Sequence, residues 1–127
     1  MAKQDSELSV ITRAKDLCSY IMTVTQKSPK QFRYTFVSRL QNLSLSVIEN
    51  LYRANDIYPQ NARMASQRLE FQQRALTDIK ILAYFSMMAM EQGCILAKQF
   101  EQISRLAADC QFMTAAWMSS DQKRFKS

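Results

Sequence analysis

The chain has 127 residues, no histidine, and a formal net charge of +6 from 17 Lys and Arg against 11 Asp and Glu. The length suits one domain, residues 1–127, that buries about two-thirds of the surface exposed by its unfolded form. The missing histidine excludes Ser-His and Cys-His nucleophile pairs and the common zinc and iron sites, and the single glycine excludes glycine-rich phosphate loops.

Neither the carboxylates nor the cysteines form a catalytic or metal-binding pattern. Asp78 lies two turns after Glu70, but Arg74 occupies the i+4 position between them, which is typical of a solvated ion-pair face. The three cysteines (Cys18, Cys94 and Cys110) lack C-x-x-C spacing, which favours reduced, partly buried thiols in the cytoplasm. The sequence therefore predicts a protein that is not an enzyme and that uses no metal or cofactor.

No membrane segment is expected. The most apolar run, residues 81–90, is about half as long as a bilayer-spanning helix. The first residues mix acids with bases and do not form a signal peptide. We therefore expect a soluble, cytoplasmic protein.

The first half of the chain contains two predicted helices. Residues 6–25 repeat apolar side chains, starting at Leu8, at spacings of three and four; Asp5 or Ser6 provides a cap, and Pro29 ends the element. Residues 33–57 carry a wider apolar stripe that indicates contact on two sides, and Pro59 follows its end.

The second half contains two more predicted helices. Residues 62–92 form the longest, and Gly93 suits a left-handed C-terminal cap. Residues 97–119 keep the helical spacing as far as Trp117, and the basic tail, residues 120–127, is expected to fray. Four amphipathic helices with short breaks predict an all-α, antiparallel, up-down-up-down four-helix bundle.

The third predicted helix has so many apolar side chains that they cannot all lie on the one face that points into a four-helix core. Either this helix is central, with methionines filling gaps, or Tyr84, Met87 and Met88 face another subunit. We expect a homo-oligomer.

Residues 17–48 contain no Asp or Glu, yet they include Lys27, Lys30, Arg33 and Arg39. This segment spans the break between the first two predicted helices. Basic residues at a helix start cost that helix a few tenths to about 1 kcal/mol each, so stability alone would favour acids there. Exposed cations and helix N-terminal amides together bind phosphate. The segment therefore predicts an anionic ligand, of which nucleic acid is the commonest.

Three of these four residues, Lys27, Lys30 and Arg39, also have a structural explanation. Lys27 favours the end of the first helix, Lys30 solubilises a loop, and Arg39 pairs with a carboxylate such as Glu49 or Asp109. The interleaved aromatics are core or staple residues more often than base-stacking platforms; they are Phe32, Tyr34 and Phe36. Less central candidates for phosphate contact are Arg53, Lys123 and Arg124.

Four stretches of sequence resemble a known family of small four-helix-bundle proteins. They are residues 28–36 (Ser-Pro-Lys-Gln-Phe-Arg-Tyr-Thr-Phe), residues 39–42 (Arg-Leu-Gln-Asn), residues 49–55 (Glu-Asn-Leu-Tyr-Arg-Ala-Asn) and residues 115–119 (Ala-Ala-Trp-Met-Ser). The family includes proteins encoded in intervening sequences of bacterial 23S ribosomal RNA genes and the accessory variability determinant (Avd) proteins of diversity-generating retroelements. The chain departs from the family where Ala115 and Ala116 replace a frequent glycine.

The resemblance implies a five-fold homo-oligomeric ring, a homopentamer, with a basic surface. In the retroelement branch it implies binding to the reverse transcriptase and its template RNA, in support of error-prone, adenine-directed cDNA synthesis. We therefore expect a non-catalytic accessory protein of a diversity-generating retroelement that binds RNA or DNA through phosphates and supports mutagenic retrohoming. Two alternatives stay open: the ribosomal intervening-sequence branch, and a protein–protein scaffold that binds no nucleic acid.

Overall fold

A computed structural model describes the backbone of residues 2–125 and the side chains of residues 9–125. The described chain is helical and contains no strand. Its elements are α1 (Ala2–Thr25), a 3₁₀-helix η1 (Lys30–Phe32), a π-helix η2 (Arg33–Val37), α2 (Ser38–Asn55), α3 (Ala62–Glu91) and α4 (Ala97–Arg124). The all-α prediction is confirmed for this part of the chain.

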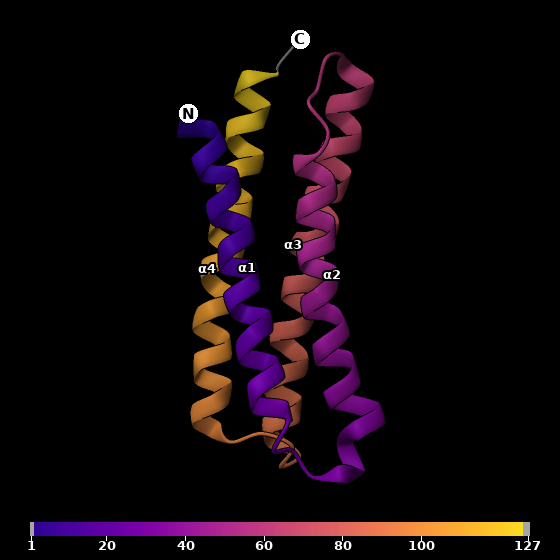
Figure 1. The fold of residues 1–127 in the computed structure, drawn as a ribbon, viewed down its shortest axis with the longest axis vertical. Helices are drawn as coiled ribbons and strands as arrows, with labels where there is room; N and C mark the ends of the chain where they lie inside the picture. Colours follow the sequence, from indigo (N-terminus) through magenta and orange to yellow (C-terminus); the bar gives the residue numbers. More distant parts are fainter. Residues whose placement is uncertain (1, 126–127) are drawn as a thin grey trace.

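The four long helices run alternately up and down, as predicted. Helix α1 packs against α2 and α4, and α3 packs against the same two helices on the other side. Figure 1 shows the bend between α1 and α2 at one end of the bundle, together with the turn between α3 and α4. The opposite end holds the connection between α2 and α3 and the C-terminus.

The core consists of apolar side chains at helical spacing on the inward face of each helix. Burying one such Leu, Ile or Val stabilises the fold by roughly 1.5–3 kcal/mol. Completely buried examples from the four helices are Leu17, Ile21, Leu40, Val47, Leu51, Ile79, Leu82 and Ile103. The predicted apolar stripes contain Ile21, Leu40, Val47, Leu51 and Ile103. Ile79 and Leu82 lie in the apolar half of the third predicted helix, whereas Leu17 lies outside the predicted stripe of the first.

Both ends of α3 are capped by local hydrogen bonds. At its start, the Asn61 side-chain oxygen accepts a hydrogen bond from the Met64 amide at 2.9 Å, an N-cap that the sequence reasoning missed. At its end, Gly93 adopts a φ of 84°, as predicted. The Cys94 amide donates to the Ala89 carbonyl and the Gly93 amide to the Met90 carbonyl, which together form a Schellman motif.

Two helix starts differ from the prediction. Helix α1 begins at Ala2 rather than near residue 6; the side chains of the expected caps, Asp5 and Ser6, and of Leu8 lie outside the described residues. Helical structure in the second segment begins at Lys30, not at Arg33, and passes through a 3₁₀ turn and a π turn before α2. The expected α-helix over residues 33–57 is therefore an α-helix only from Ser38 to Asn55.

Helix α4 continues to Arg124, five residues beyond its expected end at Ser119. The first residues of the expected frayed tail are therefore helical. Asp121 is buried and ion-paired, which holds this last turn against the bundle. Residues 126–127 lie outside the described chain.

Candidate nucleic-acid interface

The bend between α1 and α2 is fixed by short backbone turns and by one long-range contact. The Lys27 amide donates to the Val24 carbonyl and the Ser28 amide to the Thr25 carbonyl. The Ser28 hydroxyl donates to the Cys94 carbonyl at 2.8 Å, which ties the bend to the turn between α3 and α4. The bend is therefore an anchored surface at one end of the bundle.

Three predicted phosphate ligands, Lys27, Lys30 and Arg33, lie together on this bend, and we call them the bend cluster. All three side chains are exposed. Within the described residues, the ion pairs involve other cations, and none joins the bend cluster to a carboxylate. The cluster is therefore a concentration of positive charge without an acidic partner in the described part of this chain.

The helix start in the bend carries neither an acid nor a side-chain cap. Neither η1 nor η2 has an acidic residue in its first turn or a capping side chain. Because helical structure begins at Lys30, Arg33 lies one turn inside it rather than at its first position. The positive end of the helix dipole consequently lies at Lys30 and adds to the field of the bend cluster.

Arg39 contacts an aromatic ring instead of a carboxylate. Its guanidinium carbon lies 5.2 Å from the centre of the Phe85 ring on α3, a cation–π contact. Among the described ion pairs, none connects Arg39 to Glu49 or Asp109, the two carboxylates considered from the sequence. Arg39 is exposed near the start of α2, so it lies towards the same end of the bundle as the bend cluster.

The three aromatics of the bend have different environments. Phe32 and Phe36 are half-buried against the core, and their ring centres are 6.1 Å apart at an angle of 53°. These two match the expectation of core or staple residues. Tyr34 is 85% exposed and has no described ring contact.

The other three predicted phosphate ligands lie at the opposite end of the bundle. Arg53 is in the last turn of α2, an 18-residue helix that spans about 27 Å. Its guanidinium forms an exposed ion pair with Glu49 at 2.8 Å. Lys123 and Arg124 are in the last turn of α4, at the end that Figure 1 shows far from the bend. The seven predicted residues therefore form two separate groups.

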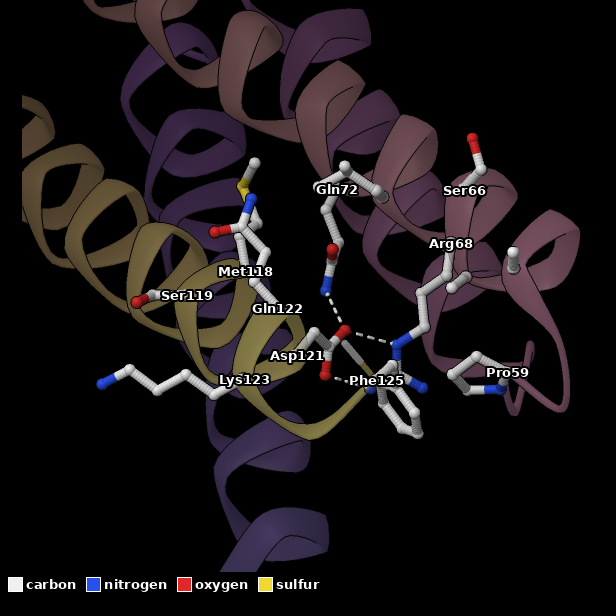
Figure 2. Close-up of a pocket in the computed structure, with 13 residues that line it drawn as sticks. Pro59, Ser66, Arg68, Gln72, Met118, Ser119, Asp121, Gln122, Lys123 and Phe125 are labelled. Atoms are coloured by element: carbon white, nitrogen blue, oxygen red, sulfur yellow. Dashed lines mark hydrogen bonds and ion pairs between the residues drawn. The ribbon is translucent and has the colours of Figure 1, made fainter. Parts of the chain in front are cut away.

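Arg124 contacts Asp121, the centre of a buried polar cluster. Figure 2 shows Arg68, Gln72 and Asp121 of this cluster. Arg68 is 2% exposed; its Nε lies 2.6 Å and its Nη2 3.0 Å from the two carboxylate oxygens of Asp121. The Gln72 amide nitrogen donates to the same carboxylate at 2.9 Å, and Arg124 donates at 3.2 Å. Arg68 also donates to the Ile57 carbonyl, so the cluster connects α3, α4 and the chain after α2.

The cluster lies in the wall of a pocket of about 650 Å³ between the start of α3 and the end of α4. The Lys123 side chain extends away from the ion pair (Figure 2). The sequence reasoning missed Arg68, Gln72 and Asp121, although a signal was present. The core positions of α3 extend back in steps of three and four to 72 and 68, and those of α4 extend forward to 121.

The thiols have the environment of structural cysteines. Cys18, Cys94 and Cys110 are free and buried. Burial raises the pKa of the Cys110 thiol to about 12, and Asp109 adds to this effect. Burial also raises the pKa of Cys94, against a smaller lowering effect of its hydrogen bond with Ser28. A raised pKa leaves little thiolate, the nucleophilic form.

The three side chains expected at a subunit contact differ in their exposure. Tyr84 is 60% exposed, while Met87 and Met88 are half-buried. Helix α3 contacts α2 and α4, so it has an outer face, where Tyr84 lies.

The described chain contains no set of three or more Cys, Asp or Glu side chains grouped as metal ligands. None of its described helices has the length and apolarity required to cross a membrane. A scan against family models finds no matching family, and a search of curated proteins finds no matching relative.

Proposed function

We propose that this protein is a non-catalytic nucleic-acid-binding protein that contacts phosphates through the bend cluster and Arg39. The observation that supports this proposal best is the exposure of Lys27, Lys30 and Arg33 without an acidic partner among the described residues. A polyanion supplied in trans would neutralise this end of the molecule.

The nearest acids along the chain at this end of the bundle form no described ion pair with the bend cluster. Glu91, at the end of α3, and Glu101, on α4, lie toward the same end of the bundle and are exposed. Neither forms a described ion pair with the bend cluster, and Lys98 in the first turn of α4 adds another exposed cation. In the part of the chain that the structure describes, no exposed helix presents a row of side chains to a groove at the bend, so we expect its cations to contact phosphates, with weak sequence selectivity.

The resemblance of residues 28–36, 39–42 and 49–55 supports a narrower proposal. On that basis, the protein is an accessory protein of a diversity-generating retroelement that works with a reverse transcriptase in the cytoplasm and assembles as a homopentameric ring. Tyr84, Met87 and Met88 are the proposed subunit contacts, with Tyr84 already exposed on the outer face of α3. Arg53, Lys123 and Arg124 have a smaller part in this proposal because Arg53 and Arg124 already contact carboxylates.

Binding to labelled, mixed-sequence RNA and DNA at moderate salt tests the proposal. We expect retention of both at micromolar protein. The variant Lys30→Ala/Arg33→Ala should weaken binding about equally across sequences, because phosphate contacts carry no sequence information. The matched control Arg63→Ala/Lys80→Ala removes the same charge from exposed positions on α3 and should retain most of the affinity. Absence of any retention would favour the protein–protein scaffold.

A further inference from the structure

Tyr34 is the most exposed of the large apolar side chains in the described chain, at 85%. It lies in the π-helix η2 (Arg33–Val37), next to Arg33 and one turn after Lys30. Turns of π-helix are rare and occur frequently at functional sites. The ring therefore extends into solvent from the segment that also carries Lys30 and Arg33.

Nothing described in the chain accounts for Tyr34 structurally. It takes part in no described hydrogen bond or ring contact, whereas Tyr58, another exposed tyrosine, packs edge-on against Phe125 at 6.1 Å. The segment under Tyr34 is fixed, because Phe32 and Phe36 on either side pack against each other and the core. Because the backbone under Tyr34 is fixed, binding of a ligand would order only the side chain of this residue.

We propose that Tyr34 is a stacking platform for an unpaired base of single-stranded RNA or DNA, with Lys30 and Arg33 on the flanking phosphates. This inference rests on the proposed nucleic-acid function and adds its substrate class. Cations attract the phosphates of single strands and duplexes alike. A ring can stack only on an exposed base face, which single strands offer and which duplexes cover with neighbouring bases.

The test compares a labelled single-stranded oligonucleotide with a loop-free, blunt-ended duplex that has the same number of phosphates, by fluorescence anisotropy at one salt concentration. We expect Tyr34→Ala to weaken single-strand binding by about 5- to 150-fold, the range for loss of one base–aromatic stack. Duplex binding should change by less than about twofold, because the phosphate contacts remain. Tyr34→Phe keeps the ring and should behave as the wild type.

Tyr52→Ala is the matched control, since Tyr52 is also exposed but lies near the far end of α2. It should leave both affinities unchanged. The stacking inference is overturned if Tyr34→Ala binds the single strand as the wild type does, or loses equal affinity for both ligands. If Lys30→Ala/Arg33→Ala still weakens both ligands in that case, the proposed function stands without the stacking. A wild-type protein that binds neither ligand would overturn both.

Discussion

Arg68 and Asp121 form the buried ion pair that closes the end of the bundle opposite the bend. The carboxylate accepts hydrogen bonds from Arg68, Gln72 and Arg124, so it compensates a guanidinium that is almost excluded from water. Removing one partner of a buried pair leaves an uncompensated charge, which is far more costly than losing an exposed pair.

Asp121→Ala should therefore lower the free energy of unfolding by about 3–5 kcal/mol, measured by urea denaturation. Glu49→Ala removes the exposed partner of Arg53 and should cost less than about 1 kcal/mol. An equal loss of free energy of unfolding in the two variants would show that the buried ion pair stabilises the fold no more than the exposed one does.

Cys110 makes the free energy of unfolding depend on pH in the alkaline range. Its pKa is raised from 9.0 to about 12 in the folded protein, chiefly by burial. The unfolded thiol ionises above pH 9 while the folded thiol stays protonated, so its contribution is complete below pH 9 and is lost as pH rises toward 12.

The free energy of unfolding under reducing conditions should consequently fall more steeply between pH 9 and 12 in the wild type than in Cys110→Ala. All other groups are common to the two proteins, so the difference between the profiles isolates the Cys110 thiol. Parallel pH profiles would mean that the thiol ionises with nearly the same pKa in the folded and unfolded chains.

At the scale of elements, the turn after α3 depends on a single residue. Gly93 has a φ of 84°, and a Cβ at this position would meet no atom within 4 Å beyond its chain neighbours. The cost of a side chain there therefore comes from the strained local backbone and not from a clash with another part of the fold.

Gly93→Ala should destabilise the protein by about 1–2 kcal/mol, the cost of a left-handed conformation for an L-residue, measured by thermal or urea unfolding. The neighbouring Gln92→Ala, at a right-handed φ of −87°, should change stability by less than about 0.5 kcal/mol. A neutral Gly93→Ala would mean that the turn adopts another conformation without loss.

Helical spacing in the sequence predicts the four long helices and most of their core, because the period of 3.6 residues is repeated over many turns. It predicts the end of α3 well, since Gly93 marks it. It misses the length of α4, because a polar residue such as Asp121 is expected at the surface. The sequence does not show that Asp121 pairs with Arg68 across the bundle. It also misses the π turn at Arg33, since no local residue pattern distinguishes that turn from an α-helical start.

At the scale of the whole molecule, the fold places at opposite ends of the bundle cations that the sequence predicts as one set of phosphate ligands. Lys27, Lys30 and Arg33 share one end of the bundle, and Arg124 lies at the other, where it contacts Asp121. The sequence could predict the acid-free bend directly. It could not predict the partners of the tail residues, which come from contacts between helices distant in the chain.

The proposed homo-oligomer can be tested by measuring the molar mass in solution. Light scattering should report a homo-oligomer, and Tyr84→Glu should shift it toward the monomer, because a charge would be buried in the proposed contact. Phe112→Glu changes another exposed aromatic, on α4, and should leave the mass unchanged. A monomeric wild type at high concentration would contradict the ring.

The most direct test of the bend cluster is the salt dependence of nucleic-acid binding. Each phosphate contact releases condensed counterions, so losing two contacts should flatten the log–log slope of affinity against salt by about two. We predict this change for Lys30→Ala/Arg33→Ala and almost none for Arg63→Ala/Lys80→Ala, which lowers the net charge equally. Identical slopes in the wild type and the bend variant would contradict the account, because these cations would then bind no phosphate.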